Sequence, residues 1–182
     1  GGDGYWIFTT RGRAIAFGAA DHHGDVAHLD LNGPIVDSVA TPTGLGYYQI
    51  GSDGGIFASG DATFNGSIQT VVNALSPGTA AVDWLSSPIV GLVPNPGGSG
   101  YWLVGGDGGT FSFGAPFRGS VPQVLGNLAL NAPVNGMVAY GNGYLMVASD
   151  GGVFTFSDRE FLGSLGAVEL SSPVVAIAPI SG

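Results

Sequence analysis

Apolar residues in this chain occur in short runs that are separated by polar, glycine-rich segments. The stretch GYWLVGGDGGTFSFG, residues 100–114, shows the arrangement: two apolar runs flank a polar centre that contains an aspartate. Two such runs joined by a few turn residues predict a β-hairpin. In YWLV, residues 101–104, neighbouring positions are all apolar, so both faces of this hairpin are expected to be buried.

The same arrangement occurs four times along the chain. Each copy opens with a Gly-Tyr pair, at Gly4, Gly46, Gly100 and Gly143. Two further landmarks follow in a constant order, an F-x-G-S segment in three copies and a proline-led apolar run in all four. Landmarks that recur in one order indicate an internal repeat of about 42 residues. The repeat boundaries are predicted near 4–45, 46–99, 100–142 and 143–182.

Each repeat predicts four short strands: the proline-led run, the Gly-Tyr run, the aromatic run after the turn, and the F-x-G-S segment. A small sheet buried on both faces and repeated at this period is typical of a β-propeller blade. We therefore predict an all-β fold in which residues 1–182 form one four-bladed β-propeller domain of about sixteen strands. The last strand, 173–179, is predicted to pair with the N-terminal blade and close the ring. The alternative is half or an arc of a larger propeller, which leaves association with a second copy open.

The composition agrees with this fold and excludes several classes of partner. Glycine accounts for 34 residues, and there are 13 Asp and Glu against 4 Lys and Arg, which gives a net charge of −9. This chain lacks the positively charged surface that binds nucleic acids and anionic membranes, so neither is expected as a partner. No apolar run has the length of a transmembrane helix, and the absence of cysteine excludes disulfides. The chain begins without Met or a signal-peptide pattern, so we expect a processed chain or a piece of a longer one.

The repeat pattern G-Y-W-x-V-x-S-D-G-G-x-F-x-F-G, followed by F-x-G-S and P-[IV]-V, resembles the propeller-type repeats of secreted actinobacterial cell-wall-associated proteins. Residues 52–55 and 149–152 carry S-D-G-G in full, 106–109 has Gly in place of Ser, and 10–13 reads T-R-G-R. The resemblance covers essentially the whole chain. It implies a secreted or cell-surface location and an accessory role beside peptidoglycan hydrolase or esterase domains.

An aspartate stands at the tip of three hairpins, at Asp53, Asp107 and Asp150. Aspartate accepts hydrogen bonds from backbone amides two residues on, and the glycines beside it adopt positive φ angles, so we predict structural turns. These tips also resemble the Asp-box turn of sialidase-type propellers, which is structural as well. The alternative is calcium, which requires six to eight oxygen ligands, whereas each tip supplies one carboxylate. No cofactor is therefore expected.

The first repeat departs from the pattern in two places. Its tip carries Arg11 and Arg13, and its F-x-G-S segment is replaced by the sequence DHHGD, residues 21–25. Strand alternation predicts that His23 and Asp25 point to one face. We interpret this cluster as a solvated, degenerate blade edge without a metal; a zinc or anion site is the first functional alternative, and catalysis is the second. The candidate metal ligands are His22, His23, Asp25 and His28.

The second repeat contains an insertion around SPGTAAVDWLSS, which includes Asp83 and Trp84. An exposed tryptophan can stack on a sugar ring or anchor a partner protein, and it can equally fix its loop against the scaffold. The aromatic residues that recur at equivalent strand positions are instead predicted to pack between blades. The candidate ligand-binding residues are Arg11, Arg13, Asp83 and Trp84.

The sequence lacks the motifs of common enzyme classes, such as a nucleophile elbow, HExxH or a phosphate-binding loop. We therefore predict a non-catalytic extracellular module that binds a partner protein or a cell-surface polysaccharide through its loops. The alternative is a purely structural subunit of a surface assembly, with a homo-oligomer as one form of it. A hydrolase ranks third, because aspartates are numerous enough to supply a pair of carboxylates.

Overall fold

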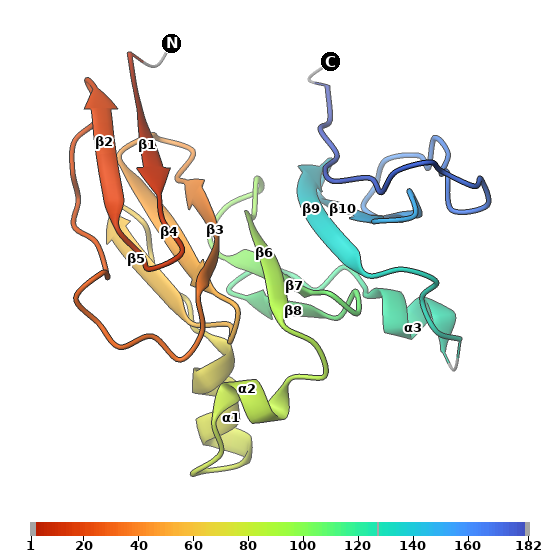
Figure 1. The fold of residues 1–182 in the computed structure, drawn as a ribbon, viewed down its shortest axis with the longest axis horizontal. Helices are drawn as coiled ribbons and strands as arrows, with labels where there is room; N and C mark the ends of the chain where they lie inside the picture. Colours follow the sequence, from red (N-terminus) through yellow and green to blue (C-terminus); the bar gives the residue numbers. More distant parts are fainter. Residues whose placement is uncertain (1–2, 127, 181–182) are drawn as a thin grey trace. The chain divides into compact units, whose positions relative to one another are not determined.

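The computed structural model describes residues 3–126 and 128–180 of the chain. The chain divides into two compact units, Gly1–Leu85 and Ser86–Gly182 (Figure 1). Each unit consists of small antiparallel sheets, so the all-β prediction is confirmed at this level. Strand pairing among the described residues forms separate sheets and no closed ring. None of the helices among these residues is long and apolar enough to cross a membrane.

The N-terminal unit contains two sheets and a helical insertion. The first sheet has two strands, β1 (Gly4–Phe8) and β2 (Ala14–Gly18). The second sheet has three strands in sequence order, β3 (Ile35–Ala40), β4 (Gly46–Gly51) and β5 (Ile56–Gly60). Two helices follow, α1 (Ile68–Leu75) and α2 (Ala81–Trp84).

The C-terminal unit contains two sheets of three strands each. One is formed by β6 (Ile89–Pro94), β7 (Tyr101–Gly105) and β8 (Thr110–Phe113), and the short helix α3 (Val121–Leu125) follows it. The other is formed by β9 (Val134–Tyr140), β10 (Gly143–Ala148) and β11 (Val153–Phe156). In every three-stranded sheet the Gly-Tyr strand lies in the middle, flanked by the proline-led strand and the aromatic strand.

The F-x-G-S segments are not strands, which corrects the prediction of four strands per repeat. Their glycines, Gly66, Gly119 and Gly163, have φ angles of 126°, 132° and 132°. Backbone in this region cannot continue a strand, and it favours glycine because a side chain would be strained. The segment therefore turns the chain away from the sheet, and after Gly66 and Gly119 a helix begins.

The final strand predicted at 173–179 is not confirmed. Residues 173–180 have no regular secondary structure. An extended segment becomes a strand only when a neighbouring strand accepts and donates its backbone hydrogen bonds, and the described strands provide no ladder for this one. As a result, β1 and β2 form the smallest of the described sheets.

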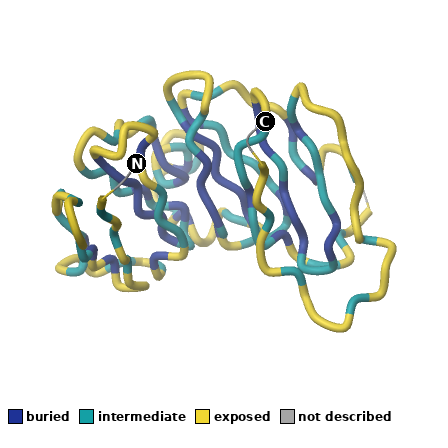
Figure 2. The backbone as a smooth tube through the Cα atoms, turned by 90° about the horizontal axis from the view of Figure 1, so that it is seen from above, coloured by how far each residue is buried: buried dark blue, intermediate teal, exposed yellow. Residues whose placement is uncertain are grey.

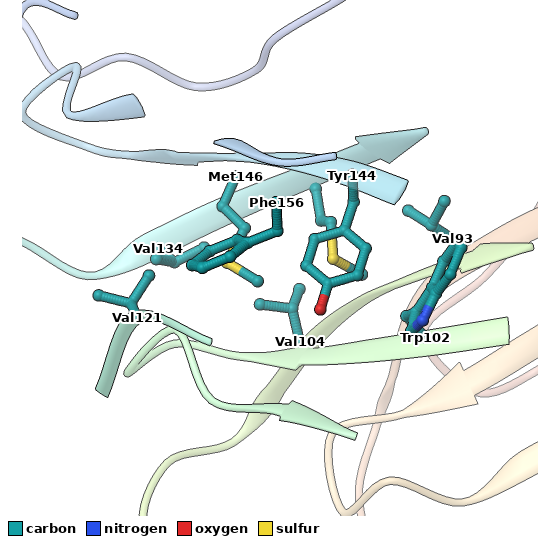
Figure 3. Close-up of a cluster of buried hydrophobic side chains, with 9 residues drawn as sticks. Val93, Trp102, Val104, Val121, Val134, Tyr144, Met146 and Phe156 are labelled. Atoms are coloured by element: carbon teal, nitrogen blue, oxygen red, sulfur yellow. The ribbon is translucent and has the colours of Figure 1, made fainter. Parts of the chain in front are cut away.

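The central strands are buried on both faces, as the sequence predicts. Every residue of β4 and β7 is buried, and Figure 2 shows the buried stretches following the strands while the exposed stretches follow the connecting loops. In the C-terminal unit the rings of Trp102 and Tyr144, from neighbouring sheets, lie 5.1 Å apart and are both fully inaccessible (Figure 3). Burial of each large apolar side chain in this cluster contributes about 1.5–3 kcal/mol. Side-chain packing between successive sheets therefore holds each unit together.

Close packing against the adjacent strand requires glycine at the first position of each Gly-Tyr strand. A Cβ atom built on Gly143 would lie 2.0 Å from the carbonyl oxygen of Phe156, and one on Gly46 would lie 2.4 Å from that of Ser59. These oxygens belong to the backbone of the adjacent strand and cannot move aside. Only glycine lets the two strands approach this closely.

Candidate functional site

The hairpin tips share one backbone geometry in all four repeats. At the second tip, the amide of Gly51 donates to the carbonyl of Gly55 at 2.9 Å, and the amide of Gly54 donates to the carbonyl of Gly51 at 2.9 Å. The third and fourth tips repeat both bonds with distances between 2.8 and 2.9 Å. The first tip makes them as well, from Thr9 to Arg13 at 3.0 Å and from Gly12 to Thr9 at 2.8 Å.

The tip aspartates complete these turns with their side chains. The Oδ1 atom of Asp53 accepts a hydrogen bond from the amide of Gly55 at 3.0 Å. Asp107 and Asp150 accept the equivalent bonds at 2.9 Å. The glycine after each aspartate has φ between 74° and 81°. Each carboxylate thus makes the bond that a structural turn requires. Within the described residues, no group of three or more His, Asp or Glu side chains is arranged to hold a metal ion.

The first tip differs in charge from the other three. Arg11 and Arg13 are both exposed, and neither guanidinium group forms an ion pair within the described residues. The hydroxyl of Thr9 accepts from the amide of Arg13 at 3.1 Å and holds this turn without an aspartate. A cleft of about 360 Å³ lies beside the tip and is lined by Thr10, Arg11, Leu29, Asp30, Leu31, Asn32, Gly33 and Pro34. Arg11, which the sequence predicts to bind a ligand, therefore lines a cleft in the structure.

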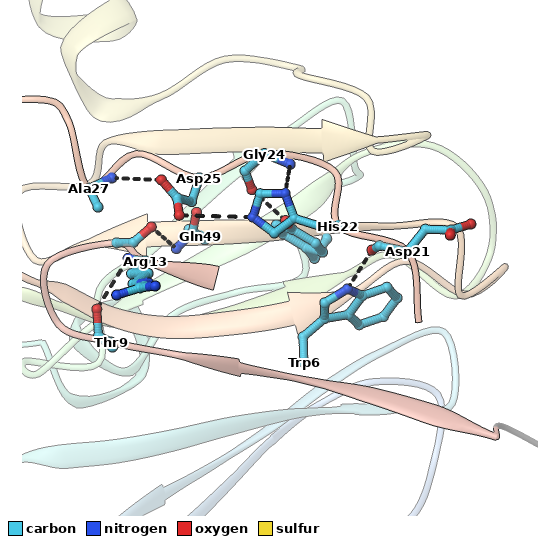
Figure 4. A network of polar contacts seen from close by, with 11 residues as sticks. Trp6, Thr9, Arg13, Asp21, His22, Gly24, Asp25, Ala27 and Gln49 are labelled. Atoms are coloured by element: carbon cyan, nitrogen blue, oxygen red, sulfur yellow. Dashed lines mark hydrogen bonds and ion pairs between the residues drawn. The ribbon is translucent and has the colours of Figure 1, made fainter. Parts of the chain in front are cut away.

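The histidine cluster is arranged differently from its prediction (Figure 4). Residues 21–25 form no strand, so the alternation that would place His23 beside Asp25 does not apply. Instead His22 Nε2 lies 3.9 Å from Asp25 Oδ2, and His22 Nδ1 accepts from the amide of Gly24 at 3.3 Å. The ring of His23 packs between aromatic residues, 6.1 Å from Trp6 and 6.0 Å from Tyr47.

The remaining members of the cluster do not converge on one point. Asp25 Oδ1 accepts from the amide of Ala27 at 3.3 Å, as in a local turn. His28 is exposed. The structure brings only His22 and Asp25 together, and a tetrahedral zinc site requires four ligands.

Gly24 makes the contact that the F-x-G-S glycine makes elsewhere. The Tyr47 hydroxyl donates to the Gly24 carbonyl at 2.5 Å, and the Tyr144 hydroxyl donates to the Gly119 carbonyl at 2.6 Å. Burial raises the pKa of Tyr47 above its ordinary value, and the nearby carboxylate of Asp25 raises it further, while a backbone hydrogen bond at His23 acts in the opposite direction. The divergent DHHGD segment of the first repeat thus retains the structural contact of its counterparts.

The insertion in the second repeat is a folded pair of helices rather than a loop. Gln69 joins them: its amide nitrogen donates to the Thr79 carbonyl at 3.1 Å, and its amide oxygen accepts from the Ala81 amide at 2.8 Å. Asp83 and Trp84 lie on α2, and the Trp84 side chain is 38% exposed. Both residues are therefore accessible from solvent, although they line none of the larger clefts found among the described residues.

Asp61 is a further polar residue that the sequence analysis did not select. Its carboxylate accepts hydrogen bonds from the hydroxyls of Thr43 and Thr41, the latter at 2.8 Å. These two bonds, from Thr43 and then Thr41, lower the pKa of Asp61 below its ordinary value. Thr41 and Thr43 lie in the β3–β4 turn and Asp61 follows β5, so this carboxylate fixes the turn to the end of β5.

A further cleft lies in the C-terminal unit and was not predicted from the sequence. It has a volume of about 680 Å³. Its walls come from β9, β10 and β11, from the loop after β11 and from the C-terminal segment, and include Leu145, Val153, Arg159, Gly163 and Ile177. The lining is mostly apolar, and these residues are too far apart in the sequence for a local pattern to connect them.

Comparisons of this chain with models of protein families, with curated proteins and with solved structures found no match.

Proposed function

We propose that this protein is a non-catalytic extracellular module, secreted or held at the cell surface, that binds a partner protein or a cell-surface polysaccharide through its loops. The observation that carries this proposal is the pair of exposed guanidinium groups, Arg11 and Arg13, at one tip beside a cleft. The other three tips carry aspartate. One tip therefore attracts anions in a chain whose net charge is −9.

Arginine favours a ligand that carries carboxylate or phosphate groups. Its planar guanidinium group donates hydrogen bonds in a fork that matches both anions. The cleft beside Arg11 adds the polar groups of Thr10, Asp30 and Asn32, which are able to bind the hydroxyl groups of a sugar. An anionic polysaccharide satisfies both requirements. The resemblance of the repeats to cell-wall-associated proteins supports the same class of ligand.

The geometry of the carboxylates supports binding over catalysis. Asp53, Asp107 and Asp150, the recurring acidic residues, each accept a backbone hydrogen bond that forms their own turn. Hydrolysis of a glycosidic bond normally needs two carboxylates that face one another across the substrate. A hydrolase remains the third hypothesis, and measurable turnover of a soluble glycan or ester that a single Asp or His substitution abolishes would establish it.

Isothermal titration calorimetry with soluble anionic and neutral cell-wall saccharides tests the proposal. The double variant R11Q/R13Q is expected to lose at least about tenfold in affinity for the anionic ligand, because two charge-assisted hydrogen bonds are removed. Binding by the wild type is expected to weaken as salt is added. The matched control is Arg159→Gln, which removes an exposed arginine elsewhere. Equal affinity of the double variant and the wild type would contradict the proposal.

For the architecture we propose a four-bladed propeller in which the C-terminal segment completes the first sheet; half or an arc of a larger propeller is the alternative. The four repeats and the common position of the Gly-Tyr strand in their sheets support a ring of equivalent blades. The second candidate function is that of a structural subunit in a surface assembly. The exposed rings of Tyr5 and Phe17, which stack at 5.1 Å on the first sheet, favour it. Light scattering over a range of protein concentrations separates the two, because an assembly subunit forms larger species as concentration rises.

A further inference from the structure

Each repeat carries one aromatic side chain at the same point of the segment that follows its aromatic strand. Three are the phenylalanines of the F-x-G-S segments, Phe64, Phe117 and Phe161, and the first repeat has His22 there. Four residues after each of them, a backbone amide donates to the carbonyl of the tip glycine, over distances between 2.9 and 3.3 Å. The donors are Val26, Ile68, Val121 and Leu165, and the acceptors are Gly12, Gly54, Gly108 and Gly151.

The backbone before these side chains is held as well. In the first three repeats, an aromatic side chain of the Gly-Tyr strand donates to the carbonyl of the residue that precedes the ring, over distances between 2.8 and 3.1 Å; Figure 4 shows the bond of the first repeat. The donors are Trp6, Tyr48 and Trp102, and the acceptors are Asp21, Thr63 and Pro116. The segment is therefore fixed on both sides of the ring that it presents.

The rings stay half open although the segment that carries them is fixed. Phe64 and Phe117 are both 53% exposed and Phe161 is 52% exposed. The His22 side chain is 51% exposed. The contacts that bury this segment come from other residues, four positions further on: Val26, Ile68 and Val121 are all buried. Equal exposure at equivalent positions separates these rings from the single exposed apolar residues that any soluble protein carries.

The size of the open surface selects the kind of ligand. A phenylalanine buries about 150–250 Å² when it is enclosed, so a half-exposed ring offers about 100 Å². A stable protein interface covers about 800 Å² on each partner. Polar residues directly follow two of the rings, Asn65 after Phe64 and Arg118 after Phe117. One such ring is too small an anchor for a protein, but it is comparable in area to one face of a sugar ring.

Hydrogen-bonding groups stand beside these two rings in fixed positions. Arg118 is exposed, and its Nε atom donates to the Asn142 carbonyl at 3.0 Å. Its guanidinium group forms no ion pair within the described part of the chain. The side-chain amide of Asn65 donates to the Thr63 carbonyl at 2.9 Å. Guanidinium and amide groups bind sugar hydroxyls, and the apolar face of a sugar stacks on an aromatic ring.

We propose that Phe64, Phe117 and Phe161 are stacking sites for a neutral polysaccharide chain of β-1,4-linked glucose-type units. Such sugars carry their hydroxyl groups around the equator of the ring and C–H groups on both faces, which fit a flat aromatic surface. One site in each of three repeats suits a ligand that itself repeats. Because the backbone on either side is already fixed, little conformational entropy is lost on binding. These residues differ from Arg11 and Arg13, so the inference goes beyond the anion site proposed above and stands without it.

Titration of the full chain with cellohexaose and with chitohexaose, followed by NMR, tests the inference. Saturation of the aromatic protons is expected to reach the C–H protons of the bound sugar. Phe117→Ala is expected to weaken binding roughly 3- to 10-fold, which is the value of one aromatic stacking contact. The triple variant F64A/F117A/F161A is expected to lose measurable binding.

Two further variants separate stacking from a general effect on the fold. Phe117→Trp keeps a flat aromatic surface and is expected to retain binding, with a change in its fluorescence as the sugar is added. Val124→Ala removes an exposed aliphatic side chain from α3 of the same unit and is the matched control, with unchanged affinity expected. Circular dichroism and urea unfolding establish that each variant is folded.

Four results would overturn the inference. They are failure of the wild type to bind either hexasaccharide, unchanged affinity of the triple variant, equal losses in Phe117→Ala and Val124→Ala, and loss of binding in Phe117→Trp with its fold intact. R11Q/R13Q is expected to bind both neutral sugars as the wild type does. If R11Q/R13Q loses this binding and the triple variant keeps it, the sugar binds at the first tip and the aromatic sites are excluded. The two proposals therefore fail separately.

Discussion

The hydroxyl group of Tyr144 donates a 2.6 Å hydrogen bond to the backbone carbonyl of Gly119, which precedes it by 25 residues. Tyr47 and Gly24 form the same pair in the N-terminal unit. Each bond links a Gly-Tyr strand to the loop that follows the preceding sheet. The Tyr144 ring is fully buried and its bond to Gly119 is buried as well, so neither partner of this bond has water as an alternative.

Replacement of Tyr144 by phenylalanine is therefore expected to destabilise the protein by about 1–3 kcal/mol, because the Gly119 carbonyl loses its buried donor. Tyr140→Phe is the matched control, since its hydroxyl makes a longer, exposed contact of 3.5 Å with the Glu160 carbonyl. Urea unfolding followed by tyrosine and tryptophan fluorescence measures both. Equal effects of the two substitutions would show that the buried bond contributes nothing specific.

The same tyrosines predict a loss of stability in alkali. Burial raises the pKa of both Tyr47 and Tyr144 above the ordinary value of 10.0. Above that value the unfolded chain loses these protons while the folded chain keeps them, so the free energy of unfolding falls as pH rises toward the folded pKa values. Urea titrations from about pH 8 to about pH 11 are expected to show this decline, and a shallower one in Y47F/Y144F. An equal slope in the wild type and in Y47F/Y144F would show that the loss of stability in alkali comes from groups other than these two tyrosines.

Gly108 at the third tip is predicted to tolerate no side chain. Its φ is +74°, and a Cβ atom there would lie 2.5 Å from the Cβ of Val121. Gly44 has a similar φ of +72° but no atom within 4 Å of the added carbon. Gly44→Ala is thus expected to cost about 1 kcal/mol from backbone strain alone, and Gly108→Ala at least about 2 kcal/mol. Thermal unfolding of the two variants compares them, and equal midpoints would contradict the close contact with Val121.

Each of the three turns at Asp53, Asp107 and Asp150 is predicted to require a side-chain oxygen that accepts a hydrogen bond, but not a negative charge. Asp150→Asn retains the oxygen that accepts from the Gly152 amide and is expected to change stability by less than about 0.5 kcal/mol. Asp150→Ala removes it and is expected to cost about 1 kcal/mol. Addition of millimolar calcium is expected to leave the melting temperature of the wild type unchanged. A rise on calcium addition that Asp150→Asn abolishes would instead favour a metal site.

The two kinds of tryptophan are predicted to respond differently to truncation. Trp102 is fully buried and donates to the Pro116 carbonyl at 2.9 Å, so Trp102→Ala is expected to cost about 3–5 kcal/mol. Trp84 is 38% exposed, and Trp84→Ala is expected to cost less than about 1 kcal/mol. Denaturant unfolding monitored by circular dichroism measures both. A large loss for Trp84→Ala would show that this side chain fixes the helical insertion.

The hairpins were predictable because short apolar runs flank a few polar, glycine-rich turn residues in each repeat. The burial of both faces followed from adjacent apolar residues, as in β7. The F-x-G-S turns and the three helices among the described residues were missed. The F-x-G-S glycines adopt positive φ, which a sequence of this kind does not distinguish from a strand glycine. Helix α1 carried a usable signal, since Ser67 is a helix-capping residue and Ile68 and Val72 recur at helical spacing.

The candidate site was predictable only in part. The departure of the first tip from the repeat selected Arg11, and the structure adds the cleft beside it. The sequence identified the histidines as a cluster, but tertiary packing decides which of them lies beside a carboxylate. The His23 ring packs against Trp6 and Tyr47, whereas His22 lies beside Asp25. The larger cleft, with Leu145 and Ile177 in its walls, results from tertiary folding alone.

The turn at Thr9 to Arg13 has a consequence for how such a chain can change. Its two backbone hydrogen bonds match those of the other tips although arginine replaces the aspartate. In the first tip the Thr9 hydroxyl accepts the bond from the Arg13 amide that an aspartate oxygen accepts at the other tips. The residue at the apex is therefore free to vary where a neighbouring side chain supplies this acceptor. A tip can thus change its surface charge while its turn persists, and an engineer can change the charge at another apex by supplying the hydroxyl as well.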